Sequence, residues 1–405
     1  MSQPNVSRFM EQLLDGVEVE WKALGDDQFF EIANSGRKPV KASLRIAGET
    51  PYYGANNIQD YVGGYTHDGK YALIAEDGSA SLESYSIQYA SGKFWANNHV
   101  HVVRGVSEVD TRYLYHFLTT VNFIPFLTGG ARAKLTRGNL VAIQIPIPCP
   151  DNPKKSLEIQ AEIVRILDAF TAMTAELTAE LNLRKKQYNY YRDQLLSFDE
   201  GEVEWKTLGE VAEYSKSRIS HTELDGSNYV GVESLLQNRA GKIDSTRTPD
   251  SGNLTQYSSG DILIGNIRPY LKKIWHADRI GGTNGDVLVV HPTDITINSR
   301  YLYQVLADDK FFEYNMQHAK GAKMPRGNKP KIMEYLVPIP YPDDVEKSLK
   351  EQARIVAILD KFDALTNSIT EGLPREIELR QQQYEYYRDL LLSFPKPEAD
   401  AAVST

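Results

Sequence analysis

Two stretches of the chain carry apolar residues at the spacing of one face of a long helix. In the first, residues 157–198, the apolar positions step alternately by four and three residues, the heptad seam of a coiled coil. An extra step of four, a stutter, falls in the tandem Thr-Ala-Glu-Leu repeat of residues 174–181. The predicted seam consists of Ile159, Ile163, Ile166, Phe170, Met173, Leu177, Leu181, Tyr188, Tyr191, Leu195 and Phe198.

A second stretch repeats this pattern nearer to the C-terminus but is interrupted. Gly372 and Pro374 follow its first heptads, and we therefore predict a break in the helix there. A new helix is expected to have Pro374 near its first turn. We predict that the two helical copies pack against each other, antiparallel, as a scaffold. The apolar positions of the second copy are Ile355, Ile358, Phe362, Leu365, Ile369, Tyr384, Tyr387, Leu391 and Phe394.

The two remaining long segments have a different pattern. Short apolar runs such as residues 99–103 and 286–290 alternate with turns rich in Gly, Asn, Asp and Ser, which is typical of β-strands. Each segment also has one helix-like stretch, near residues 112–119 and 300–306. The sequence thus predicts an α+β protein, in which two mixed α/β modules are joined by long antiparallel coiled-coil helices.

The chain also repeats itself in order. The offset between matched residues grows steadily from 184 to 196, as expected for collinear copies with small insertions, so the chain consists of two similar halves with an internal pseudo-two-fold repeat. The matched segments are 19–22 with 203–206, 112–115 with 300–303, the hexapeptides Lys-x-x-Arg-Gly-Asn at 134–139 and 323–328, Pro-Ile-Pro at 146–148 and 338–340, and 187–198 with 383–394.

These patterns divide the chain into five segments. Residues 1–15 are predicted to complete the repeat, because residues 11–14 resemble residues 193–196 at the end of the helical part. The other four are a first module at 16–150, a helical spacer at 151–200, a second module at 201–342, and a second helical region with the C-terminal tail at 343–405.

Composition limits the classes of function. The 405 residues carry a net charge of −9, which by itself argues against binding to nucleic acid phosphates. The acidity lies in the tails and the helical stretches, however, and a near-neutral module can still carry a basic face. Cys149 is the only cysteine, which excludes a disulfide framework and a cysteine-rich metal site. Without an apolar membrane span or a secretory signal, we expect a cytoplasmic protein with no membrane partner.

The sequence lacks the motifs of a catalytic centre. There is no phosphate-binding loop, no G-x-G-x-x-G after a strand, no Asn/Asp-Pro-Pro-aromatic tetrapeptide of adenine methyltransferases and no zinc-ligand spacing. Asp343 and Asp344 lie where a helix is predicted to begin, which favours N-terminal helix charge over a metal site. We therefore expect a recognition protein with no catalytic residue, cofactor or metal of its own.

Basic and amide side chains in the modules are the candidate DNA contacts. Arginine can form bidentate hydrogen bonds with guanine or phosphate, and asparagine can pair with adenine. A basic turn before a strand, or a solvated face, explains the same residues equally well. A weaker polar group in the first module consists of Lys93, Asn97, Asn98 and His99. The predicted DNA-binding residues are Lys134, Arg137, Asn139, Arg268, Lys272, Lys273, Lys323, Arg326 and Asn328.

The helical stretches resemble a known family. Residues 156–198, with the tandem repeat and the ending Gln-Tyr-x-Tyr-Tyr-Arg-Asp-x-Leu-Leu-Ser-Phe, look like the central conserved region of a type I restriction-modification specificity subunit. Residues 348–397 resemble the distal conserved region of its type IC branch, and residues 16–25 and 201–209 fit the flanks. The two modules then resemble the family's target recognition domains.

The resemblance implies a non-catalytic protein that recognises double-stranded DNA. Each target recognition domain would read one half of a bipartite asymmetric site, while the helices would set the spacer and bind two methylation subunits. Those subunits would carry S-adenosylmethionine and methylate adenine at N6 after flipping it out of the duplex. Restriction subunits would add cleavage that uses ATP and magnesium. Two alternatives stay open: a stand-alone DNA-modifying enzyme and a two-domain protein-binding scaffold.

Overall fold

The computed structural model describes residues 16–130, 133–199 and 201–395, and these form two compact units. The described residues of the first unit fall within Met1–Met173 and Arg380–Thr405, and those of the second within Thr174–Leu379. Residues 1–15, which the sequence predicts to complete the repeat, lie outside the described residues. Each unit therefore contains one module together with helical segments from both copies of the repeat.

A six-stranded sheet forms the body of the first module, with the strand order β2-β7-β5-β6-β3-β4. Strand β7, between β2 and β5, is buried on both faces, since the side chains from Val100 to Val103 are at most 1% exposed. Helix α2 packs on the sheet, and the Asp110 side chain caps its first turn. The bounds are β2 (Phe30–Ile32), β3 (Ala47–Tyr53), β4 (Ile58–Val62), β5 (His67–Ala75), β6 (Ile87–Ala96), β7 (Val100–Gly105) and α2 (Thr111–Leu118).

The second module has the same four-strand core, in the order β12-β19-β16-β17, beside a separate small sheet in the order β13-β15-β18-β14. Helix α6 takes the place of α2 and is capped by Asn298 in the same way. The bounds are β12 (Ala212–Tyr214), β13 (Arg218–Ser220), β14 (Tyr229–Val230), β15 (Asn253–Tyr257), β16 (Ile262–Gly265), β17 (Ile274–His276), β18 (Gly281–Thr283), β19 (Val287–Pro292), α6 (Ser299–Leu306) and α7 (Asp309–Gln317).

Each module is closed at its base by a two-stranded antiparallel ribbon. β1 (Val19–Ala23) pairs with β10 (Gln144–Pro148), so that Trp21 lies opposite Pro146. β11 (Val203–Thr207) pairs with β20 (Leu336–Pro340) in the same register, so that Trp205 lies opposite Pro338. The recurring Val-Glu-Trp-Lys and Pro-Ile-Pro segments are therefore partners in space, and the predicted repeat is confirmed.

The helical copies are α4 (Pro153–Leu195) and the pair α9 (Val345–Asn367) and α10 (Gly372–Leu391). The break between α9 and α10 lies where the sequence predicts it. Gly372 has φ +74°, and a Cβ at this position would lie 2.4 Å from the carbonyl oxygen of Ala364. Only glycine fits this turn without strain, because the left-handed region is unfavourable for other residues. In α4, the corresponding stretch is continuous helix.

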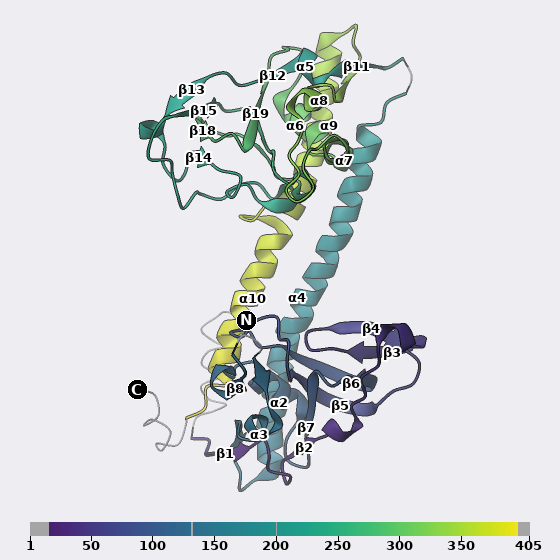
Figure 1. Ribbon diagram of the computed structural model, residues 1–405, viewed down its shortest axis with the longest axis vertical. Coiled ribbons are helices and arrows are strands. Elements are labelled where there is room, and N and C mark those ends of the chain that lie inside the picture. Colours follow the sequence, from purple (N-terminus) through teal and green to yellow (C-terminus); the bar gives the residue numbers. More distant parts are fainter. Residues whose placement is uncertain (1–15, 131–132, 200, 396–405) are drawn as a thin grey trace. The chain divides into compact units, whose positions relative to one another are not determined.

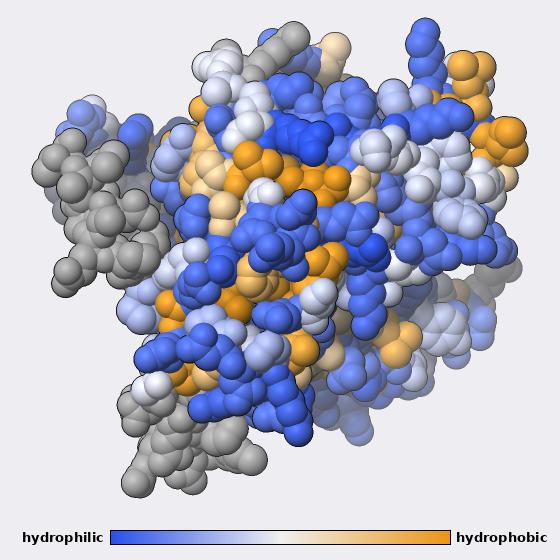
Figure 2. Space-filling view, turned by 90° about the horizontal axis from the view of Figure 1, so that it is seen from below, coloured by the Kyte–Doolittle hydropathy of each residue, from blue (hydrophilic) through white to orange (hydrophobic). Residues whose placement is uncertain are grey.

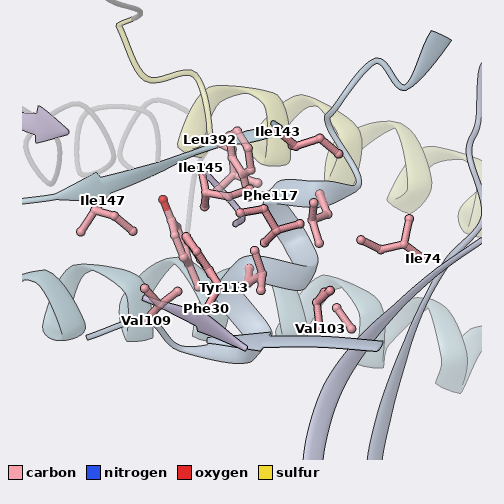
Figure 3. Packing of buried hydrophobic residues seen from close by; sticks show 14 of the residues in the cluster. Phe30, Ile74, Val103, Val109, Tyr113, Phe117, Ile143, Ile145, Ile147 and Leu392 are labelled. Carbon is pink, nitrogen blue, oxygen red and sulfur yellow. The ribbon is translucent and has the colours of Figure 1, made fainter. Parts of the chain in front are cut away.

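Each unit contains helical segments from both copies, and these pack against each other. In the first unit, Phe170 of α4 stacks on Tyr387 of α10 with ring centroids 5.3 Å apart. In the second, Tyr191 of α4 stacks on Phe362 of α9 at 5.4 Å. These pairs run in opposite directions along the chain, as the predicted antiparallel arrangement requires. Leu392, just beyond α10, packs in the first unit's core beside Phe117 and Ile145 (Figure 3).

The predicted seam of α4 is correct in part. Ile159 and Ile163 are buried, but Met173 is 40% exposed. Leu167, which the heptad pattern leaves out, is fully buried. The reason is that this part of α4 packs against the module as well as against α10, so the buried stripe is wider than a coiled-coil seam.

A buried glutamine fixes each module to its own helix. In the first unit, the Gln160 side chain accepts from the Asp110 N–H at 2.8 Å and donates to the Glu108 carbonyl at 2.9 Å. In the second, Gln352 accepts from the Asn298 N–H at 2.8 Å and donates to the Thr296 carbonyl at 2.9 Å. The two glutamines thus satisfy equivalent backbone groups in the loops that begin α2 and α6.

Replacing the second glutamine is expected to destabilise the protein. Gln352→Ala leaves the Asn298 N–H and the Thr296 carbonyl without this partner in a buried place, which costs about 1–3 kcal/mol of unfolding free energy. Chemical denaturation measures the loss. Gln194→Ala, at an exposed position of α4, is the control and should change stability by less than about 0.5 kcal/mol. Equal effects of the two variants would contradict the anchoring role.

The Asp344 side chain accepts from the Lys347 N–H and caps α9, as expected for helix-start charge. Hydrophilic side chains cover much of the face shown in Figure 2, with apolar ones between them. Among the described residues, no helix is long and apolar enough to cross a membrane, and no group of three or more His, Cys, Asp or Glu could hold a metal ion.

Candidate nucleic-acid interface

Three chain segments meet at the end of strand β5 in the first module. Glu76 follows this strand directly, and its N–H donates to the carbonyl of His99, just before β7, at 2.8 Å. The Leu135 N–H in turn donates to the Glu76 carbonyl at 2.8 Å. Leu135 belongs to β9 (Lys134–Leu135), in the segment through which the chain leaves the module. We call this meeting point the first strand-end site.

The second module has the same arrangement at the end of β16. Asn266 follows this strand, and its N–H donates to the carbonyl of Asp286, just before β19, at 2.8 Å. The Gly327 N–H donates to the Asn266 carbonyl at 3.0 Å. Loops distant in sequence therefore converge in the same way in both modules, and we call this the second strand-end site.

The backbone hydrogen bonds correct the alignment of the two hexapeptides. They make Leu135 equivalent to Gly327, and so Lys134 equivalent to Arg326, an offset of 192 residues. Matching the letters Lys-x-x-Arg-Gly-Asn gives an offset of 189 and is wrong by three residues. The backbone hydrogen bonds at the strand ends, and not the identities of the side chains, define which residues of the two modules are structurally equivalent. Arg137-Gly138-Asn139 falls instead within the short helix α3 (Arg137–Leu140).

At the first strand-end site, a partly buried carboxylate forms ion pairs with two basic side chains. Glu76 Oε1 lies 2.9 Å from Lys134 Nζ, and its Oε2 lies 2.5 Å from Arg37 Nη1. Burial opposes the charged form of Glu76, but the hydrogen bonds from Arg37 and Lys134 outweigh it and lower the pKa of the carboxyl. Asp77, the next residue, pairs with His99 at 2.5 Å on the surface.

At the second strand-end site, the charges are fewer and more exposed. Arg326 Nη1 lies 2.6 Å from Asp286 Oδ1, and 53% of the arginine side chain is exposed. Arg268 lies beside this pair, because its N–H donates to the carbonyl of Pro325 at 2.7 Å. Its own side chain and that of Tyr270 are exposed. The structure thus brings together two predicted DNA-binding residues, Arg268 and Arg326, from distant parts of the sequence.

Lys272 and Lys273, the other two residues of this basic cluster, form contacts that stabilise their own loop. Lys272 Nζ lies 2.8 Å from Asp309 Oδ1, at the start of α7. Lys273 Nζ donates to the Val232 carbonyl at 2.6 Å, and burial lowers its pKa. Arg268 and Lys272 both have left-handed φ values, 53° and 51°, which a packed surrounding must impose on residues other than glycine. The two lysines hold the loop that presents Arg268.

The remaining predicted residues are dispersed. Asn139 donates from Nδ2 to the Phe126 carbonyl at 2.6 Å and so supports its own module. Arg137 and Lys323 have exposed side chains. Asn328 is the residue before α8 (Lys329–Met333). Among these four, Arg137 and Lys323 are the ones whose exposure suits contact with a ligand.

Sequence reasoning did not select the carboxylates of the two sites. Glu76 and Asp77 follow an apolar strand, and Asp286 precedes one, so their position at a strand end was the available signal. His99 was part of a polar group in the sequence but had no identified partner. The pairing of Glu76 with Lys134, and of Asp286 with Arg326, depends on strand order, which the sequence pattern alone does not provide.

A methyl group at Gly327 is expected to disrupt the second site. A Cβ there would lie 2.6 Å from Asn315 Oδ1 and 2.7 Å from Asn266 Oδ1, so buried groups would have to move. At Gly138, the nearest atom would be Thr136 Oγ1 at 3.9 Å. Gly327→Ala should cost about 1–3 kcal/mol of stability and weaken DNA binding, whereas Gly138→Ala should fold normally. Thermal unfolding and gel shifts compare the two, and equal stability would contradict the packing argument.

The sequence matches a described protein family in both halves. Residues 17–184 and 200–379 each fit the type I restriction modification DNA specificity domain. The chain belongs to this family. It is a type I restriction-modification specificity subunit, and its two modules are the target recognition domains.

Individual relatives cover nearly the whole chain. A putative type I restriction enzyme specificity subunit of Haemophilus influenzae is 45% identical over 405 residues, which is 96% of this chain and 99% of that protein. The EcoR124I/EcoR124II specificity subunit of Escherichia coli is 38% identical over 418 residues, covering 96% and 98%. The S subunit from M. genitalium, at 15% identity, has the same fold with a TM-score of 0.61 over 95% of this chain and 98% of that one.

Proposed function

We propose that this specificity subunit reads a bipartite DNA site, with one target recognition domain on each half. The observation that carries the proposal is the equivalence of the strand-end sites. Each is built from the same three segments of its module, yet they present different side chains, Lys134 with Glu76 in one and Arg326 with Asp286 in the other. A common scaffold with different polar groups is what recognition of two different base sequences requires.

Partner subunits would supply the chemistry. We infer two methylation subunits, which would bind S-adenosylmethionine and methylate adenine at N6, and restriction subunits, which would use ATP and magnesium. The reciprocal exchange of helix ends supports two copies of one partner, because it gives both units an equivalent helix arrangement. The chain itself would supply recognition and no catalytic group.

Selection from random DNA tests this proposal. The subunit, purified with and without its methylation subunit, is incubated with a library of random duplexes, and the bound DNA is sequenced. We expect the complex to select two short conserved half-sites separated by a fixed number of unconserved base pairs. A single uninterrupted site, or no sequence preference in the complex, would overturn the proposal. Consumption of S-adenosylmethionine by the subunit alone would indicate a DNA-modifying enzyme instead.

A further inference from the structure

In the ion pair of the second strand-end site, the backbone of Arg326 is held by hydrogen bonds and its side chain is accessible. The N–H and carbonyl of Arg326 both bond to Lys320, at 2.8 and 2.9 Å, and the next residue, Gly327, is bonded to Asn266. The backbone of Arg326 is thus held on two sides, while 53% of its side chain is exposed. Among the described residues, only Nη1 of the guanidinium is bonded, so Nε and Nη2 are available to a ligand.

We propose that Arg326 and Asp286 together read one G·C base pair in the half-site of the second target recognition domain. This inference rests on the proposed function. A guanidinium can donate two hydrogen bonds to O6 and N7 of guanine, and a carboxylate can accept one from N4 of the paired cytosine. The pair therefore presents donors and an acceptor side by side, which complements the two acceptors of guanine and the donor of cytosine in the major groove.

The adjacent carboxylate favours a base over a phosphate. Asp286 is 34% exposed and neutralises Arg326 at 2.6 Å, so the pair offers little net attraction to the phosphate backbone. It also holds the guanidinium in place before DNA binds, which reduces the entropy lost on binding. A phosphate-binding arginine would gain nothing from a carboxylate at this distance.

The first unit has a different pair at the equivalent place. Lys134 bonds to Glu76, but Glu76 is only 14% exposed and also bonds to Arg37, so it is less available to a base. The exposed groups there are Lys134 and the Asp77–His99 pair. The proposed G·C reading thus applies to the second recognition domain alone.

Two variants and a matched control test the inference in the complete complex. Arg326→Ala removes the guanine contact, and Asp286→Ala removes the cytosine contact while leaving Arg326 uncompensated. Arg354→Ala is the control, because this arginine of α9 is equally exposed, at 53%, and pairs with Glu351 at 2.7 Å. Each complex is given the random duplex library, and affinity is measured for the selected wild-type site at several salt concentrations.

Arg326→Ala is expected to weaken binding by about 5- to 100-fold and to relax one G·C position of one half-site. Asp286→Ala should relax the same position, raise affinity for random duplex and steepen its salt dependence, because a positive charge is unmasked. The control should change neither selection nor salt dependence.

Other results would overturn the inference. If Arg326→Ala weakened binding to every sequence alike and lowered the salt slope by about 1, Arg326 would be a phosphate contact. If selection and affinity were unchanged in the folded variant, the ion pair would be structural. If the wild-type complex selected no bipartite site, the proposed function itself would fail. If the wild-type complex selected a bipartite site that neither variant altered, only the inference about Arg326 and Asp286 would fail.

Discussion

Inserting one further Thr-Ala-Glu-Leu unit after Leu181 is expected to lengthen the gap between the two DNA half-sites by one base pair. Both half-site sequences should stay the same. Deleting one of the two existing units should shorten the gap by one base pair. The tandem repeat lies within the continuous helix α4, directly after the residue at which the helix passes from the first unit to the second, so an inserted unit lengthens α4 at that passage.

The added length and the added rotation of the helix predict different numbers of base pairs for the change in the gap. Four residues lengthen a helix by about 6 Å, which is close to two base pairs at roughly 3.4 Å each. The same residues turn it by about 400°, a net rotation of ~40°, whereas one base pair turns DNA by about 34–36°. A slight bend of the DNA can absorb an axial error, but a recognition domain must face its groove in phase. Rotation therefore decides in favour of one base pair.

Methylome sequencing of host cells that carry variants with one, two or three units measures the gap directly. The side chain of Thr178 donates to the Thr174 carbonyl at 2.8 Å, within the helix, and Leu177 and Leu181 are half-buried, so an added unit repeats an existing environment. An unchanged gap in all three variants would show that α4 does not set the spacing. Altered bases in either half-site would show that the helix and the modules are not independent.

Exchange of the first module is expected to replace one half-site completely and to leave the other unchanged. The structure defines the boundaries of the exchange, because β1 and β10 pair with each other at the base of the first module, as β11 and β20 do in the second. Residues 26–142, between these strands, should therefore be replaced by the equivalent residues of another family member. The side chains of the first strand-end site then change together, whereas Arg326 and Asp286 keep their surroundings.

The exchange must preserve the contacts between module and helix. Gln160 binds backbone groups of the exchanged segment, and the Arg112 Nε lies 2.8 Å from Asp168 Oδ1 of α4. A donor module should therefore carry an arginine at the position of Arg112. Binding-site selection before and after the exchange checks the result. A change in both half-sites would contradict the assignment of one module to each half.

The sequence by itself determined the fold class, the repeat and the helical elements of this protein. Heptad spacing is a local property and located α4, while Gly372 and Pro374 located the break before α10, where Gly372 has a left-handed conformation. The recurrence of Val-Glu-Trp-Lys and Pro-Ile-Pro located the two ribbons. The resemblance to the specificity subunits came mainly from the helical stretches, which carry the tandem repeat and the ending Gln-Tyr-x-Tyr-Tyr-Arg-Asp-x-Leu-Leu-Ser-Phe, and residues 16–25 and 201–209 fitted the flanks.

The sequence predicts that the two helical copies pack antiparallel, but only the tertiary structure decided which side chains of the two copies meet. Tyr191 and Tyr387 have the same neighbours in sequence, so their heptads are equally suited to Phe170 and Phe362. The structure pairs each tyrosine with the phenylalanine of the other copy. A heptad pattern specifies that a seam is buried but does not identify its partner.

The tertiary structure likewise decided which residues meet at the two strand-end sites. Lys134 and Arg326 became equivalent only when the backbone hydrogen bonds at the strand ends were known, because matching letters placed the second hexapeptide three residues out of register. Asp286 joined Arg326 through strand order, across 40 residues of chain. The sequence specifies the type of each side chain, but packing of the whole module sets the distance between two charges.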